Sequence, residues 1–152
     1  MNLFYWFCYR TGITPWEHAA THRPAVEQIM ALFDREERER QPPYGKALDL
    51  GCGTGHWSVE LASRGWQVTG IDIVSAALRK ARKRAKNEAV EGNFIHADAT
   101  KLRASGLGSD FQLVWDFGTV HGLTQTQREA VGRGPLRNLM RTGMRSSLRC
   151  PR

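Results

Sequence analysis

The sequence predicts an α/β fold in which helices cover both faces of a parallel sheet. Between residues 46 and 131, short apolar runs alternate with longer segments of helical spacing. Turns rich in glycine separate the two kinds of segment, above all the turn that contains Gly51, Gly53 and Gly55. Strands that alternate with helices in this way pair in parallel, with the helices packed against the sheet.

Residues 1–45 are predicted to form an N-terminal helical segment that ends in a linker. Thr14-Pro15 is a reasonable helix start, and a second helix is expected from Pro24, with apolar residues at helical spacing after it. Acids and bases alternate from residue 34 to residue 40, which predicts a solvated helix end with local ion pairs. Residues 41–45 contain two prolines and a glycine, so they break the helix.

Four strands and three helices are expected in the following part of the chain. The strands are Ala47–Leu50, Gln67–Ile71, Asn93–His96 and Gln112–Trp115. The helices are His56–Arg64, closed by Gly65; a helix capped by Ser75 that ends near Asn87; and one opened by the capping-box sequence Thr124–Gln127.

The chain has 152 residues, enough for one domain, and a formal net charge of +7. Six arginines and no acid lie after Gly132, so the preceding residues hold 16 bases (22 − 6) against 15 acids. Residues 132–152 are therefore predicted to be a basic, disordered tail, with a nucleic-acid-binding arm as the alternative. The basic run Arg79–Lys86 is expected to be the solvated face of a helix.

The cysteines Cys8, Cys52 and Cys150 are odd in number and lack the spacing of zinc ligands. No metal is expected, and a reducing cytoplasm is the simpler compartment. The apolar start, Leu3–Tyr9, is too short to span a membrane, so no membrane partner is expected.

The strongest chemical signal is the stretch Ala47–Gly55, in which a buried strand leads through three alternate glycines into a helix. A ligand can lie against bare backbone there, and the helix start suits a negatively charged group. Asp72 ends the next strand, where an acid can accept hydrogen bonds from ribose hydroxyls. Capping of the following turn is the alternative role of Asp72.

This stretch resembles the first motif of the class I S-adenosylmethionine-dependent methyltransferases, and the resemblance extends from Lys46 to Gly122 and more loosely to Thr14-Pro15-Trp16. It implies a Rossmann-like sheet with S-adenosyl-L-methionine as cofactor. Its methionine part would meet the turn of Gly51, Cys52, Gly53 and Gly55, with Asp49 orienting the amino group. Asp72 would meet the ribose, and Asp98 and Ala99 the adenine, although an ordinary loop role explains Asp98 nearly as well. Ile73 is also expected to contact the cofactor.

The fourth strand ends at Asp116, which is expected to point to the methionine end of the cofactor. The loop after it, Phe117–Gly122, resembles that of small-molecule methyltransferases of the thiopurine and tellurite-detoxification type. It lacks the Asn/Asp-Pro-Pro-aromatic sequence of the enzymes that methylate amino groups in nucleic acids. His121 is the candidate general base, with a structural role as its alternative.

The family has seven strands, but 21 residues (152 − 131) remain after the last expected helix. The sequence therefore predicts an incomplete sheet, truncated or frame-shifted near Gly132. Its open edge would favour a homodimer or a partner chain.

Two rival functions remain open at this stage. One is an NAD-dependent oxidoreductase, although the glycines follow G-x-G-x-G and not G-x-G-x-x-G. The other is a non-catalytic, cofactor-binding remnant or an RNA-binding module.

Overall fold

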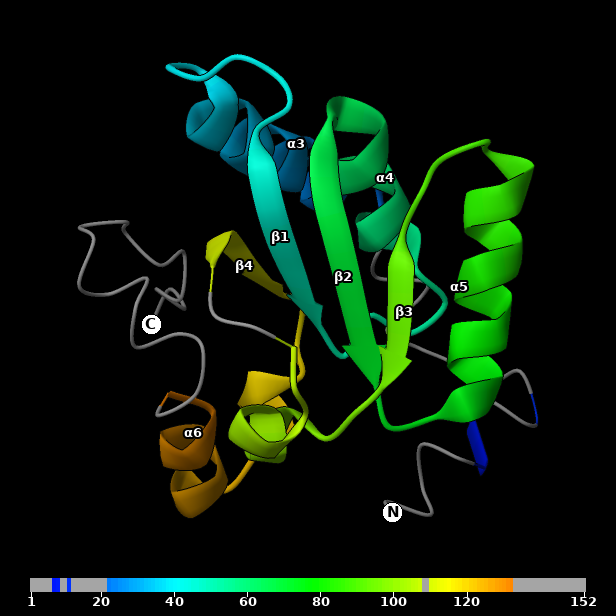
Figure 1. The fold of residues 1–152 in the computed structure, drawn as a ribbon, viewed down its shortest axis with the longest axis vertical. Coiled ribbons are helices and arrows are strands. Elements are labelled where there is room, and N and C mark those ends of the chain that lie inside the picture. Colours follow the sequence, from blue (N-terminus) through cyan, green and yellow to red (C-terminus); the bar gives the residue numbers. More distant parts are fainter. Residues whose placement is uncertain (1–6, 9–10, 12–21, 108–109, 133–152) are drawn as a thin grey trace.

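The computed structural model describes residues 7–8, 11, 22–107 and 110–132 (Figure 1). The helix start expected at Thr14-Pro15 and the basic tail after Gly132 lie outside the described residues.

All four described strands belong to one parallel sheet, as predicted. They are β1 (Gly45–Leu50), β2 (Trp66–Asp72), β3 (Asn93–His96) and β4 (Phe111–Asp116). Their order is β3-β2-β1-β4, so β1 lies in the middle, between β2 and β4. The carboxyl ends of the strands therefore meet at one edge of the sheet, the lower edge in Figure 1.

The helices follow the predicted bounds closely. They are α3 (Arg23–Glu37), α4 (His56–Arg64), α5 (Ser75–Asn87) and α6 (Gln125–Gly132), with short 3-10 helices η1 (Ala99–Ala104) and η2 (Val120–Gly122). The capping box before α6 is confirmed, because Thr124 and Gln127 exchange two hydrogen bonds of 2.9 and 3.4 Å between side chain and backbone.

The expectation that Ser75 caps α5 is wrong. Ser75 is the first residue of the helix, and the cap position belongs to Val74, whose side chain offers no hydrogen bond. The backbone N–H of Val74 donates to Asp72 Oδ1 at 2.7 Å. The acid at the end of β2 thus fixes the entry into α5.

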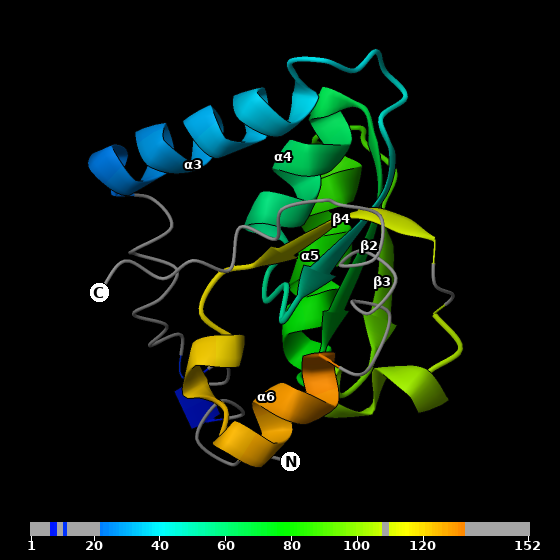
Figure 2. The same cartoon turned by 90° about the vertical axis from the view of Figure 1, so that its left-hand side faces the viewer.

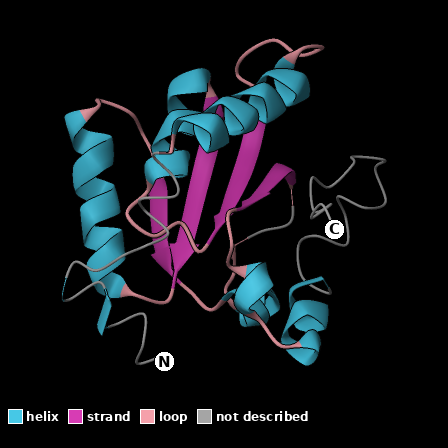
Figure 3. Cartoon of the chain, turned by 180° about the vertical axis from the view of Figure 1, so that it is seen from behind, coloured by secondary structure: helices cyan, strands magenta, loops and turns pink. Residues whose placement is uncertain are grey.

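Helices cover both faces of the sheet, as the sequence predicts. On one face, α3 and α4 pack on β1, β2 and β4 through a cluster that includes Phe33, Trp57 and Trp115. Figure 3 shows these two helices in front of the sheet. On the other face, Leu48 and Leu50 pack against η1 and against Val131 of α6. Figure 2 shows α3 and α6 well apart, one toward each end of the molecule.

The acidic and basic end of α3 is more than a solvated terminus with local ion pairs. Arg64, at the end of α4, contacts Asp34 at 2.8 Å and Glu37 at 2.9 Å on α3, and Glu60 at 2.8 Å on its own helix. The indole N–H of Trp66 also donates to Glu37 at 2.9 Å. These contacts join α3 to the start of β2, because the charged residues pair across the chain as well as along it.

Within the described part of the chain, no helix is both long and apolar enough to cross a membrane.

Candidate functional site

Three carboxylates gather at the carboxyl edge of the sheet: Asp49 of β1, Asp72 of β2 and Asp116 of β4. Asp49 and Asp72 are buried, with exposed fractions of 3% and 8%, and Asp116 is half-buried. Asp72 and Asp116 both act electrostatically on Asp49. The edge that holds the turn Gly51–Gly55 therefore concentrates acidic side chains.

The pKa of Asp49 differs strongly from that of an ordinary aspartate. Burial raises its pKa to about 7 from an ordinary 3.8, and the charges of Asp116 and Asp72 add to this effect. The hydroxyl of Ser58 donates to Asp49 Oδ2 at 2.6 Å and opposes the change. Asp49 is thus poised between its neutral and ionised forms near neutral pH.

Asp72 holds the glycine turn to the start of α5. The N–H of Gly53 donates to its Oδ2 at 2.9 Å, and the N–H of Val74 donates to its Oδ1 at 2.7 Å. Burial raises the pKa of Asp72, although these backbone hydrogen bonds oppose it. The turn-capping role is thus present in the structure. Each carboxylate oxygen has a further lone pair, so contact with a ribose stays a prediction.

Asp116 organises the loop that follows β4. Its Oδ1 accepts from the N–H of Val120 at 3.0 Å, and the backbone of Thr119 and Gly118 also hydrogen-bonds to it. Burial raises the pKa of Asp116, and the nearby His121 opposes this effect. The structure therefore brings His121 close enough to Asp116 to interact electrostatically. The ring of His121 is exposed, and its role as a general base stays a prediction.

The glycines of the turn have a structural reason that sequence analysis did not supply. Gly51 has a φ of 65°, and a Cβ there would lie 1.9 Å from Thr119 Oγ1. Gly55 has a φ of 79°, and a Cβ there would lie 2.8 Å from the Cβ of Ala81 on α5. Packing within the protein thus demands glycine at both positions, whether or not a ligand approaches.

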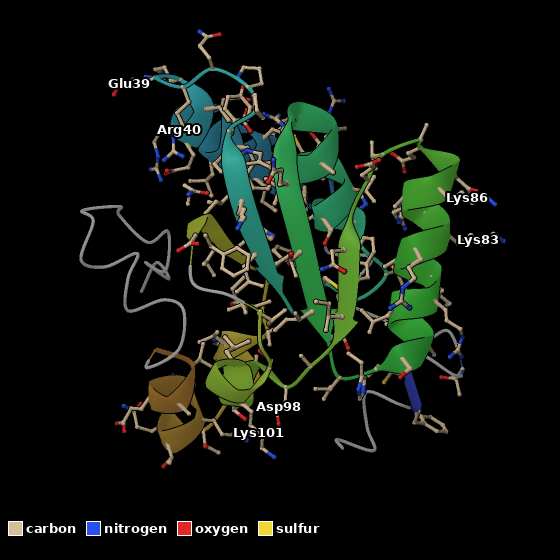
Figure 4. All side chains as sticks on the ribbon, viewed as in Figure 1. Glu39, Arg40, Lys83, Lys86, Asp98 and Lys101 are labelled. Atoms are coloured by element: carbon tan, nitrogen blue, oxygen red, sulfur yellow. The ribbon has the colours of Figure 1, made fainter. Side chains whose placement is uncertain are left out.

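Asp98 and Ala99 lie after β3, on the same side of the molecule as the carboxyl edge; Figure 4 shows Asp98 beside Lys101. Asp98 caps η1, because its Oδ1 accepts from the N–H and the hydroxyl of Thr100 at 2.9 and 2.7 Å. Burial opposes ionisation of Asp98, but these two hydrogen bonds together with the charge of Lys101 favour it, and the pKa is lowered. The capping role accounts for an acid here, and contact with adenine stays a prediction for both residues.

Cys52 and Ile73 flank the same acids. Cys52 is buried, its N–H donates to the carbonyl of Ile71 at 2.9 Å, and burial raises the pKa of its thiol. Ile73 follows Asp72 directly, and its carbonyl lies 2.9 Å from Nε2 of His96. Their proximity to the site agrees with their predicted place, but their contact with a cofactor stays a prediction.

Two residues of the site were missed by sequence reasoning. Ser58 contacts Asp49 from α4, and the hydroxyl of Thr119 donates to the carbonyl of Leu50 at 3.0 Å, beside Gly51. Nothing in the local sequence marks Ser58. A glycine within a strand, Gly70, was the available signal, because such a residue often permits a close approach.

Within the described residues, no group of three or more histidine, cysteine or acidic side chains could hold a metal ion. The arrangement offers carboxylate acceptors and a turn of backbone N–H groups. It suits an organic ligand with a positive end and hydroxyl groups.

Comparison with known proteins agrees with this chemistry. Residues 47–143 match a family described as a methyltransferase domain. The chain belongs to this methyltransferase family. The match includes most of β1, the glycine turn and all three carboxylates.

Thiocyanate methyltransferase 1 of Brassica oleracea is 33% identical to this methyltransferase-family chain over 112 residues, which are 72% of the chain and 45% of that relative. A ubiquinone biosynthesis O-methyltransferase of Caulobacter sp. (strain K31) is 35% identical over 83 residues, or 54% of the chain and 33% of the relative. The chain thus spans between a third and a half of the length of these curated relatives.

Among solved structures, the PH0226 protein of Pyrococcus horikoshii OT3 is similar, with a TM-score of 0.62 and 32% identity. The similarity covers 72% of the chain and 49% of that structure. The predicted α/β methyltransferase fold is confirmed.

Proposed function

We propose that this chain binds S-adenosyl-L-methionine and forms the cofactor-binding part of a methyltransferase that acts on a small molecule. The family match supports the reaction class. The observation that carries the proposal is the cluster of Asp49, Asp72 and Asp116 around the turn Gly51–Gly55.

Charge favours this cofactor over a dinucleotide. S-adenosyl-L-methionine has two positive groups, a sulfonium and an ammonium, against one carboxylate, so its net charge is positive, whereas the pyrophosphate makes NAD net negative. Three carboxylates at one edge would attract the first and repel the second. The oxidoreductase alternative is therefore not favoured.

The residues present fit the cofactor in the following way. Asp49 would pair with the ammonium group, the free lone pairs of Asp72 would accept from the ribose hydroxyls, and Asp116 would face the methionine end. When bound, the sulfonium makes the methyl carbon electrophilic and supplies a neutral thioether leaving group. The protein then has to hold and orient the two reactants and exclude water.

The acceptor is proposed to be a small molecule. The two relatives named above are a thiocyanate methyltransferase and an O-methyltransferase of ubiquinone biosynthesis, and this supports a small nucleophile. The loop that contains Thr119 and His121 follows Asp116 and would border the transferred methyl group. His121 would accept the acceptor's proton where the acceptor is a thiol or a hydroxyl.

Calorimetry can test this function directly. The chain is expected to bind S-adenosylhomocysteine, the demethylated product, and to show no heat of binding with NAD. Asp72→Ala should abolish the first binding. Binding of NAD without S-adenosylhomocysteine would refute the proposal, and binding of the cofactor without methyl transfer to any acceptor would indicate a non-catalytic remnant.

We also propose residues 46–131 as the cofactor-binding domain and the cytoplasm as the compartment. The described cysteines, Cys8 and Cys52, are free thiols, which supports a reducing environment. A second copy or another chain alongside β4, which ends the described sheet, is a proposal that sedimentation analysis can test.

A further inference from the structure

Ser58 and Asp49 form a buried pair beneath the glycine turn. Ser58 lies near the start of α4, is 1% exposed, and donates its hydroxyl to Asp49 Oδ2 at 2.6 Å. Its backbone also hydrogen-bonds to Asp49. Ser58 therefore holds the carboxylate from the helix side.

The sheet leaves room for this contact. Gly70 of β2 pairs with Asp49 in the parallel register. A Cβ at Gly70 would lie 2.9 Å from Ser58 Oγ and 2.9 Å from Cys52 Sγ. Glycine weakens the interior of a strand, so its use here is explained by the space that Ser58 needs to reach Asp49.

Among the residues that the structure describes, the compensation of the Asp49 charge is incomplete. Within this part of the chain, the charges that act on Asp49 from Asp72 and Asp116 are both negative, and the hydrogen bonds that favour its ionised form both come from Ser58. A buried carboxylate held by one hydroxyl and one backbone group remains costly unless a positive charge pairs with it. A ligand cation would supply that charge.

We infer that Ser58 is a positioning residue, which orients the Asp49 carboxylate toward the ammonium end of the cofactor and so sets the affinity for its amino-acid part. This inference rests on the proposed function. It assigns Ser58 no contact with the cofactor itself.

The test compares two ligands that differ in this part. S-adenosylhomocysteine has the amino-acid end, whereas 5′-methylthioadenosine keeps the nucleoside and lacks that end. Ser58→Ala should weaken binding of S-adenosylhomocysteine by about 10-fold, the loss expected for one hydrogen bond to a charged group, and change binding of methylthioadenosine less than 2-fold. Ser63→Ala, which removes an exposed hydroxyl from the same helix, should change neither.

Two further variants separate positioning from general loss of structure. Ser58→Thr keeps the hydroxyl and should restore the ratio of the two affinities. In an Asp49→Asn background, Ser58→Ala should no longer change that ratio, because the carboxylate on which it acts is absent. Should Ser58→Ala not fold, Ser58→Cys, with a weak donor of similar size, allows the same comparison.

The pH profile gives an independent measurement. Within the described residues, Asp72, Asp116 and Ser58 act on Asp49, and Asp49 in turn acts on Cys52. His96 acts on Asp72, and His121 acts on Asp116. Removing the Ser58 hydroxyl raises the pKa of Asp49 further, so affinity for S-adenosylhomocysteine should begin to fall at a higher pH in Ser58→Ala. An equal loss for both ligands, or an unchanged pH profile, would overturn the inference. A wild-type chain that binds methylthioadenosine and S-adenosylhomocysteine equally would overturn it too, whereas one that binds neither removes the proposed function itself.

Discussion

At the scale of single residues, Asp49 shows how a binding site can cost stability. Its pKa in the folded chain is about 7, against an ordinary 3.8. The folded state therefore binds a proton that the unfolded state has released between these two pH values. The proton bound by Asp49 therefore adds to the free energy of unfolding. This contribution is complete below about pH 4 and is lost as the pH rises through 7.

Asp49→Asn should remove this pH dependence. An amide of similar shape cannot ionise, so the variant is expected to be more stable than the wild type at pH 8 by up to roughly 4 kcal/mol, since each unit of pKa is worth about 1.4 kcal/mol. The difference should shrink toward pH 5. Urea unfolding at several pH values measures it, with the exposed Glu91→Gln as control. A variant whose stability parallels that of the wild type from pH 5 to pH 8 would contradict this account.

Gly55 offers a second test at the residue scale. Gly55→Ala combines a left-handed backbone with a Cβ 2.8 Å from the Cβ of Ala81. Gly106→Ala is a matched control, because its φ is 67° and an added Cβ meets nothing within 4 Å. The control should cost about 1–2 kcal/mol of backbone strain, and Gly55→Ala about 2–5 kcal/mol, because overpacking adds to that strain. Urea unfolding measures both losses in the free energy of unfolding. Equal losses in the two variants would show that α5 can shift away from the added Cβ at no cost.

At the scale of elements, the ion pairs between α3 and α4 all involve one side chain in the described part of the chain, Arg64. Arg64 is 20% exposed and contacts three acids, and its guanidinium lies over the ring of Phe33 at 5.5 Å. Burial disfavours the charge, but hydrogen bonds to Asp34, Glu60 and Glu37 outweigh it and raise the pKa of Arg64. A network of this kind holds a helix more firmly than an isolated surface pair does.

Arg64→Met should loosen α3 without disturbing the sheet. We expect a loss of about 1–3 kcal/mol in the free energy of unfolding and faster amide exchange in α3, because Glu37 loses a partner while largely buried. Arg23→Met is the control, since the ion pair of Arg23 with Glu27 is exposed on both sides, and it should cost under about 0.5 kcal/mol. Similar losses in the two variants would argue against the network.

The elements were predictable from the sequence to a greater degree than the contacts between them. The bounds of α4 and β3 agree with the prediction because Gly65 and the apolar pair Phe94-Ile95 are local signals. The contacts of Arg64 with Asp34 and Glu37 join segments about 30 residues apart, which folding brings together and no local pattern encodes. The three acids were predictable from their places at strand ends, whereas Ser58 was not, because a serine within a helix has no distinctive spacing.

At the scale of the whole molecule, the acids of the candidate site are segregated from the most basic segments. Asp49, Asp72 and Asp116 lie at the carboxyl edge of the sheet, and exposed bases lie along α5, where Lys83 and Lys86 point away from the sheet (Figure 4). The six arginines after Gly132 supply most of the net charge of +7. Exposed charges are screened over about 8 Å at physiological salt, so the outer bases are expected to have little effect on the buried acids.

Replacing the six tail arginines by glutamine in the full chain tests this segregation. The change lowers the formal net charge from +7 to +1 (7 − 6). Any binding of single-stranded RNA by the wild type should weaken several-hundred-fold between 50 and 200 mM salt, because each neutralised phosphate contributes a slope of about −0.7 in log affinity against log salt. The variant should lose that binding and keep its affinity for S-adenosylhomocysteine within 2-fold. RNA binding that survives in the variant would contradict a role of the tail and would point to the bases of α5. The double variant Lys83→Gln, Lys86→Gln would then test α5.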